Sequence, residues 1–163
     1  TNMESMFAYS GYSSPIFTLN LGNKFDTSNV TKMCGSGHPY DGQESIQSAG
    51  MFSYVGRVNT SFTLNLGDKF DTSNVTSMSY MFYDIAYNSP TFTLDLRDKF
   101  DTSEVKNMQY MFYETGYNST IFTLNLGNKF DTSKVTNMYG MFKYVGYNSP
   151  VFTLNLGSKF CQF

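Results

Sequence analysis

The chain has 163 residues, a net charge of −2 and a charged fraction of 15%, which is enough for one domain with a sizeable core. No cluster of Lys or Arg stands out, as would be expected of a nucleic-acid binder. No apolar run approaches the roughly 18–20 residues of a membrane span. The composition therefore argues against nucleic-acid binding and membrane insertion. Because the chain begins inside a repeat, we expect it to be a fragment of a longer protein.

The dominant feature of the sequence is an internal repeat. The phrase FTLNLG, or its variant FTLDLR, recurs at intervals of 45, 30, 30 and 30 residues. It begins at Phe17, Phe62, Phe92, Phe122 and Phe152. A thirty-residue unit cannot bury its own apolar face and must stack on its neighbours. The sequence thus predicts a single repeat domain over residues 1–163, in which an insertion at 34–50 lengthens the first interval.

The first element expected in each unit is a strand. Phe62 and Leu64 alternate with Thr63 and Asn65, and this period of two predicts an apolar face turned inward. Parallel strands from successive units would then stack at about 4.8 Å.

The phrase KFDTSxV follows each of the first four strands, and a short helix is expected after it. Val75, Met78, Met81 and Phe82 have the spacing of one helix face. Three residues ahead of them are N-cap candidates: Asp71, Thr72 and Ser73. A Tyr-Asn-Ser turn then leads into the next strand. The expected unit is strand, tight loop, short helix and turn.

Leu-x-Leu followed by Phe-Asp-Thr-Ser-Asn-Val-Thr-x-Met-x-Tyr-Met-Phe resembles the BspA-like leucine-rich-repeat surface proteins. It is most similar to the mycoplasma-type surface repeat built around FDTSNVTNM. The resemblance implies an α/β leucine-rich-repeat-like solenoid of about five 30-residue units, with parallel strands and short helices. It also implies a bacterial cell-surface or secreted protein linked to adhesion rather than catalysis.

Two polar columns on the outward side of the strands are the candidate ligand-binding residues. The first is Thr18, Thr63, Thr93, Thr123 and Thr153, and the second is Asn20, Asn65, Asp95, Asn125 and Asn155. A flat polar array suits a host protein or a glycan. Alternatively, these residues keep the face soluble, or a regular Thr-x-Asn lattice orders water as in ice binding.

Tyrosines outside the core pattern form further columns, which could act in binding or as structural filler. Tyr12, Tyr87, Tyr117 and Tyr147 share the turn before the strand, and Tyr80 and Tyr110 share the expected helix, with Tyr139 one place out of register.

The remaining polar positions give little support for chemistry. One Asp per unit, at Asp26, Asp71, Asp101 and Asp131, suits helix capping better than calcium, which needs six to eight oxygen ligands. The insertion carries Cys34, His38, Tyr40, Asp41 and Glu44, for which a thiol nucleophile and a zinc site can be considered. Because the chain has a single His and the insertion is Gly-rich, we expect no catalytic residue, metal or cofactor. The insertion is then a local specificity loop, through His38, Tyr40 and Asp41, or a neutral bulge.

The sequence therefore predicts a non-enzymatic, extracellular or cell-surface adhesion module that recognises a host protein or glycan. The alternative is a structural spacer or self-assembling rod with end-to-end self-association. Four strand spacings would separate Cys34 from Cys161 by nearly 20 Å, too far for a disulfide.

Overall fold

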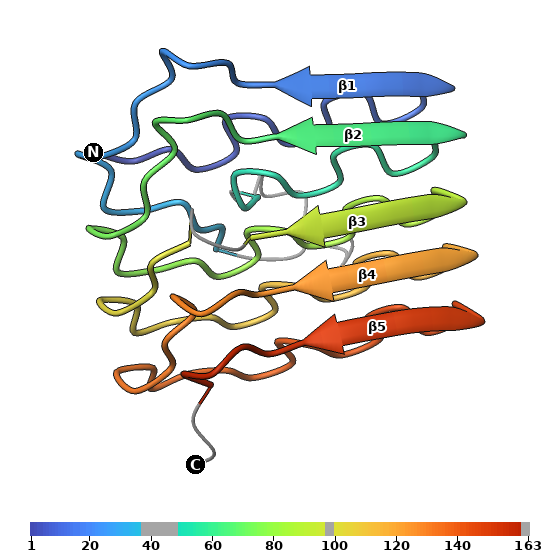
Figure 1. Cartoon of the computed structure of the whole chain (residues 1–163). Coiled ribbons are helices and arrows are strands. Elements are labelled where there is room, and N and C mark those ends of the chain that lie inside the picture. Colours follow the sequence, from blue (N-terminus) through green and yellow to red (C-terminus); the bar gives the residue numbers. More distant parts are fainter. Residues whose placement is uncertain (37–48, 97–99, 161–163) are drawn as a thin grey trace.

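The computed structural model describes residues 1–36, 49–96 and 100–160, and its five strands are parallel and follow one another along one axis (Figure 1). They are β1 (Ile16–Asn20), β2 (Ser61–Asn65), β3 (Thr91–Asp95), β4 (Ile121–Asn125) and β5 (Val151–Asn155). Where strands pair, the register places equivalent residues opposite each other, as for Phe92, Phe122 and Phe152. The predicted parallel stacking of equivalent strands is confirmed.

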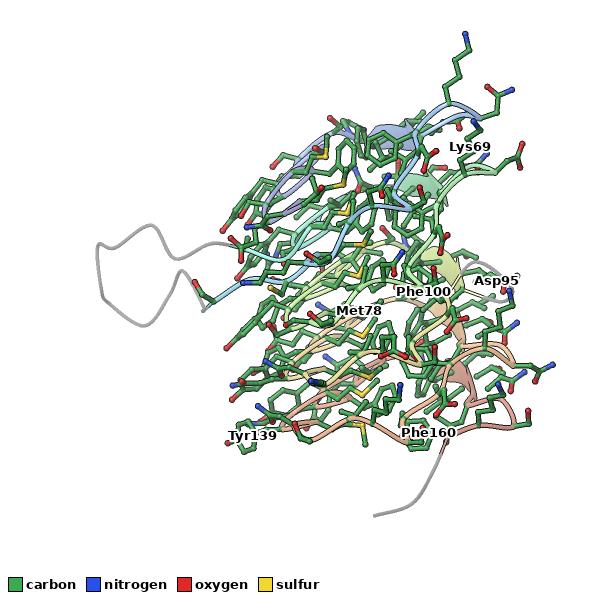
Figure 2. The ribbon with its side chains drawn as sticks, turned by 90° about the vertical axis from the view of Figure 1, so that its left-hand side faces the viewer. Lys69, Met78, Asp95, Phe100, Tyr139 and Phe160 are labelled. Carbon is green, nitrogen blue, oxygen red and sulfur yellow. The ribbon has the colours of Figure 1, made fainter. Side chains whose placement is uncertain are left out.

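The core consists of apolar columns that run the length of the stack. Phe92 and Phe122 stack with ring centroids 5.9 Å apart, and both are buried. Figure 2 shows Met78 and Phe100 inside the stack, between Tyr139 at one edge and Asp95 at the other. The four residues that suggested a helix face, Val75, Met78, Met81 and Phe82, are all fully buried. Their assignment to the core is therefore confirmed.

The segment that carries these residues is a run of consecutive turns, and the predicted short helices are absent from the described residues. Tyr80, Asp84 and Ala86 have φ angles of 60°, 58° and 53°. An α-helix of L-residues cannot contain such left-handed positions without a cost of about 1–2 kcal/mol each. The same positions are left-handed in the next two repeats, at Tyr110, Glu114 and Gly116, and at Gly140, Tyr144 and Gly146. The helix prediction was wrong in every repeat where it can be examined.

Backbone hydrogen bonding explains why turns replace a helix. The N–H groups of Tyr80, Phe82 and Asp84 donate to carbonyl oxygens of the next repeat at 2.9, 2.9 and 2.8 Å. Between them, the N–H of Met81 closes a local turn on the carbonyl of Met78 at 3.2 Å. A helix would direct every N–H along its own segment, whereas this arrangement joins each repeat to its neighbour and still satisfies the groups in between.

The FDTSxV phrase is a set of structural contacts. Asp71 Oδ1 accepts the N–H of Ser73 at 2.8 Å, and Asp26, Asp101 and Asp131 make the same bond. The buried hydroxyl of Thr72 donates to the carbonyl of Asp101 in the next repeat at 2.9 Å. The Asp column therefore caps a turn and not, as predicted, the start of a helix.

The strand ladder is interrupted between β2 and β3, because no hydrogen bond joins these two strands. Figure 1 shows them diverging toward their C-terminal ends, while the other strands run evenly spaced. We call this opening the seam. It is lined by Leu64, Asn65, Leu66, Gly67, Thr93, Leu94 and Asp95. Beneath it the core is continuous, since the rings of Phe62 and Phe92 stack at 5.1 Å.

A column of glycines just after the strands allows neighbouring repeats to approach closely. A Cβ added to Gly67 would lie 1.8 Å from the carbonyl oxygen of Gly22, and one added to Gly157 would lie 2.0 Å from that of Gly127. Only glycine permits such an approach between repeats. The sequence has Arg97 in this column after β3, and Arg97 lies outside the described residues.

Candidate binding surfaces

The Thr column lies on the outer side of the strands. Thr18, Thr63, Thr93 and Thr153 are exposed and Thr123 is half-buried. The strand register aligns Thr18 with Thr63, and Thr93 with Thr123 and Thr153. Because of the seam, these side chains form two ordered blocks and not one unbroken row.

The neighbouring Asn column has a structural role that the sequence analysis did not identify. The Oδ1 atoms of Asn20, Asn65, Asn125 and Asn155 each accept the N–H of the glycine two residues later, at 2.9–3.2 Å. Asp95 stands in the same column, and its Oδ1 accepts the side-chain amide of Asn125 at 3.1 Å. Since capping occupies the Asn carbonyl oxygens, the Thr hydroxyls are the more available groups on this face.

A second ordered surface lies on the turn runs, where tyrosine rings contact one another from repeat to repeat. Tyr87 stacks on Tyr117 with ring centroids 4.7 Å apart and ring planes 4° apart, and Tyr117 continues to Tyr147 at 5.3 Å. Twelve tyrosines form one connected network within the described residues. They are Tyr9, Tyr12, Tyr54, Tyr80, Tyr83, Tyr87, Tyr110, Tyr113, Tyr117, Tyr139, Tyr144 and Tyr147.

This tyrosine network combines a buried part with an exposed margin. Tyr54 and Tyr83 are 1% and 3% exposed, whereas Tyr139 and Tyr147 are 66% and 63% exposed. Burial raises the pKa of Tyr83, so its phenol stays neutral. Stacked rings hide their faces from solvent and present edges and hydroxyl groups. The inner tyrosines therefore stabilise the stack, and the outer ones remain accessible to a partner.

Arg57 occupies the place of a tyrosine in the column of Tyr12 and Tyr87. Its guanidinium carbon lies 5.7 Å from the ring centroid of Tyr12 and 4.3 Å from that of Tyr87, within the range of a cation–π contact. Arg57 Nε also donates to Asp84 Oδ2 at 2.6 Å, and the Asp84 side chain is 3% exposed. This ion pair links the turn runs that precede β2 and β3, on the opposite side of the layer from the seam.

Burial determines the direction of the pKa shift for Asp84 but not for Arg57. It raises the pKa of Asp84 to about 7, although the hydrogen bond and charge of Arg57 oppose the shift and Glu114 adds to it. For Arg57, burial acts to lower the pKa, but the contact with Asp84 outweighs it and the pKa is raised. The guanidinium thus stays charged while the carboxyl titrates near neutral pH.

The candidate residues of the insertion, His38, Tyr40 and Asp41, lie outside the described residues. Cys34 is a buried free thiol whose Sγ donates to Glu4 Oε1 at 3.6 Å. Burial raises the pKa of this thiol, which disfavours the thiolate that a nucleophile requires. Cys161 also lies outside the described residues.

A polar groove of about 530 Å³ follows the Asp column. It is lined by Asp26, Ser28, Asp68, Lys69, Phe70, Asp71, Ser73, Asp101 and Lys129. Lysines intervene between its carboxylates, and in the part of the chain that the structure describes no three His, Cys, Asp or Glu residues gather closely enough to hold a metal ion.

A family model described as "Mycoplasma protein of unknown function, DUF285" matches residues 46–158. The chain belongs to this family. The matched segment of the DUF285 chain contains strands β2 to β5, the seam and most of the tyrosine network. No curated protein and no solved structure matches the chain. Within the described residues, no helix of the DUF285 chain has the length and apolar character of a membrane span.

Several features of the site were missed at the level of sequence. Five further tyrosines complete the tyrosine network, and their recurrence at equivalent repeat positions was the available signal: Tyr9, Tyr54, Tyr83, Tyr113 and Tyr144. Arg57 and Asp84 each depart from their column, but a departure does not by itself reveal the partner. The seam was also missed, although Arg97 stands out in a column that is otherwise glycine.

Proposed function

We propose that this DUF285 chain is a non-enzymatic bacterial cell-surface or secreted module that binds a host protein or glycan through its exposed strand face. The exposed, register-aligned Thr column carries the proposal. Equivalent hydroxyls repeated along a rigid axis allow an extended partner to make several similar contacts. The likeness of the FDTSNV phrase to BspA-like surface repeats supports the same conclusion, and the stacked strands fit a leucine-rich-repeat-like solenoid.

The alternative is a structural spacer or self-assembling rod. It is favoured by the contacts of the repeat phrase, since Phe, Asp, Thr and Tyr each contact an equivalent or adjacent residue of the neighbouring repeat. Three apolar residues of β5 are exposed at this end of the stack and suit end-to-end association: Val151, Phe152 and Leu154 are 52%, 39% and 38% exposed. Sedimentation velocity tests this association: a mass that does not change with concentration counts against it.

Lysine substitutions on two faces separate binding from a purely structural role. The test variant carries Lys at Thr63, Thr93 and Thr123 on the strand face. The control carries Lys at Thr31, Thr76 and Thr136, an exposed column in which Lys106 occurs naturally. Both variants add three positive charges.

Binding is measured on an array of glycans and matrix proteins, and folding by circular dichroism. We expect the strand-face variant to lose binding to the array components that the wild type and the control retain, with folding unchanged in both. If the strand-face variant binds every component as the wild type does, the Thr column is not the binding surface. Equal loss in both variants would show a non-specific charge effect and would also reject it.

A further inference from the structure

We infer that the seam between β2 and β3 is a docking site for an extended peptide segment of a partner protein, held by main-chain hydrogen bonds to the strand edges on either side. The inference deepens the proposed function, and rests on it, because it places a protein partner at one position of the strand face.

The two walls of the seam are strand edges, and the equivalent edges of the other strands pair with a parallel neighbouring strand. The edge of β2 that lines the seam is the edge with which β3 pairs to β4. The edge of β3 that lines the seam is the edge with which β2 pairs to β1, because all pairs share one parallel register. An added segment would meet main-chain groups already spaced for a β-ladder. Addition of a strand to such an edge is an established mode of peptide recognition.

The main-chain N–H of Leu66, beside the seam, does not make the hydrogen bond that its counterparts in other repeats make. Just after the strands, the N–H of Leu21, Leu96 and Leu126 donates to the carbonyl of Asn65, Asn125 and Asn155 in the adjacent strand, at 2.8–2.9 Å. Leu66 holds the same position after β2 but makes no such bond to β3. Because main-chain N–H groups need a partner, a ligand that supplies a carbonyl oxygen here gains a hydrogen bond.

The size and lining of the seam fit one or two residues of extended chain. The seam encloses about 200 Å³ and is bounded by the apolar side chains of Leu64, Leu66 and Leu94 together with polar Asn65 and Thr93. Figure 1 shows β2 and β3 farthest apart at their C-terminal ends, where the added chain would enter. Strands need about 4.8 Å on either side, so the chain would engage the wide end and stop where β2 and β3 converge.

The framework beneath the seam is already closed, which makes the site preorganised. The rings of Phe70 and Phe100 stack at 5.8 Å below it. On the far side of the layer, Arg57 and Asp84 form their ion pair. A partner would therefore bind between two repeats that are already held together on both sides of the core, which lowers the cost of binding.

The probe is an acetylated and amidated pentapeptide, Thr-Leu-Asn-Leu-Gly, that copies residues 153–157. It is titrated to about 10 mM, which detects millimolar affinities, into the ¹⁵N-labelled protein while amide chemical shifts are followed by NMR. Arg97→Gly restores the glycine column and is expected to close the seam. Arg97→Ala removes the same charge but keeps a Cβ, so it is the matched control.

We expect saturable shifts at the amides of Leu64, Leu66 and Thr93 in the wild type and in Arg97→Ala, with affinity at least about tenfold lower in Arg97→Gly. Hydrogen exchange at Leu66 should be slower in Arg97→Gly, which verifies closure. Shifts confined to β1 or β5, equal affinity in all three proteins, or no saturable shift would each overturn the inference. If the array components still bind while the pentapeptide does not, the seam inference fails and the proposed function stands.

Discussion

The close approach of glycine backbones between repeats makes Gly67→Ala the sharpest test of the fold. At Gly67, φ is 77° and an added Cβ would lie 1.8 Å from the carbonyl oxygen of Gly22. At Gly22, φ is 66° but an added Cβ would meet no atom within 4 Å. The N–H of each glycine is accepted by an Asn side chain two residues earlier. Gly22→Ala is therefore a control that shares everything except the collision.

The expected loss of stability is the sum of a cost for the left-handed backbone and a cost for the collision. Alanine in the left-handed region costs about 1–2 kcal/mol at either position. At Gly67 the colliding atom belongs to the backbone and cannot rotate away, so the repeats must move apart, and overpacking of this kind costs about a further 1–3 kcal/mol. We expect Gly22→Ala to lower the free energy of unfolding by about 1–2 kcal/mol and Gly67→Ala by about 2–5 kcal/mol.

Urea unfolding followed by far-ultraviolet circular dichroism measures both values, and the slope m shows whether each variant still unfolds as one cooperative unit. If the two variants lose the same stability, the repeats do not approach each other as closely as the structure shows. The expectation that Arg97→Gly closes the seam would then fail as well, because it rests on the same kind of contact.

Two further predictions concern buried polar groups. Thr102 donates to the carbonyl of Asp131 at 2.8 Å and accepts its N–H at 2.7 Å, so Thr102→Val should lower the free energy of unfolding by about 1–3 kcal/mol. Thr136→Val, on an exposed hydroxyl, should cost less than about 1 kcal/mol, and equal costs would show that the buried contact is not formed. Because burial raises the pKa of Asp84 from 3.8 to about 7, the folded state holds this proton more tightly than the unfolded state. The contribution of Asp84 to stability is then fully present below about pH 4 and is lost toward pH 8, by up to about 4 kcal/mol. Asp84→Asn should remove that slope in urea titrations across this range. A wild-type stability that rises with pH would show that pairing with Arg57 outweighs burial.

The period, the strands and the core could be predicted from sequence because equivalent residues recur at a fixed interval and alternate between apolar and polar. The turn runs could not be, because the apolar spacing of Met78, Met81 and Phe82 is the same whether N–H groups bond within a segment or to the next repeat. Left-handed tyrosines such as Tyr80 are rare, and only the neighbouring repeat reveals the hydrogen bonds that stabilise them.

The candidate site likewise has features that the sequence could predict and features that it could not. The outward position of Thr63 followed from alternation along the strand, whereas the capping role of Asn65 depended on the glycine two residues later. The tyrosine network extends beyond the predicted columns because aromatic contacts join residues of different columns, such as Tyr113 and Tyr144. Repeat spacing identifies which residues are equivalent, but it does not identify contacts between columns.

The residues that differ between repeats point to one position on the strand face. The recurrent Phe and Gly positions, and the Asp-Thr pair of the FDTS phrase, contact the neighbouring repeat, so stacking explains why they recur. Three departures lie in the repeats of β2 and β3: Arg57 replaces a tyrosine, Asp95 replaces an asparagine, and Arg97 replaces a glycine. Arg57 and Asp84 join the layers of β2 and β3 on the turn side, while the strands separate on the other side. A stack optimised only for length would have no reason to interrupt its ladder and reinforce the opposite side at the same level. This coincidence favours a recognition site at the seam over a uniform rod.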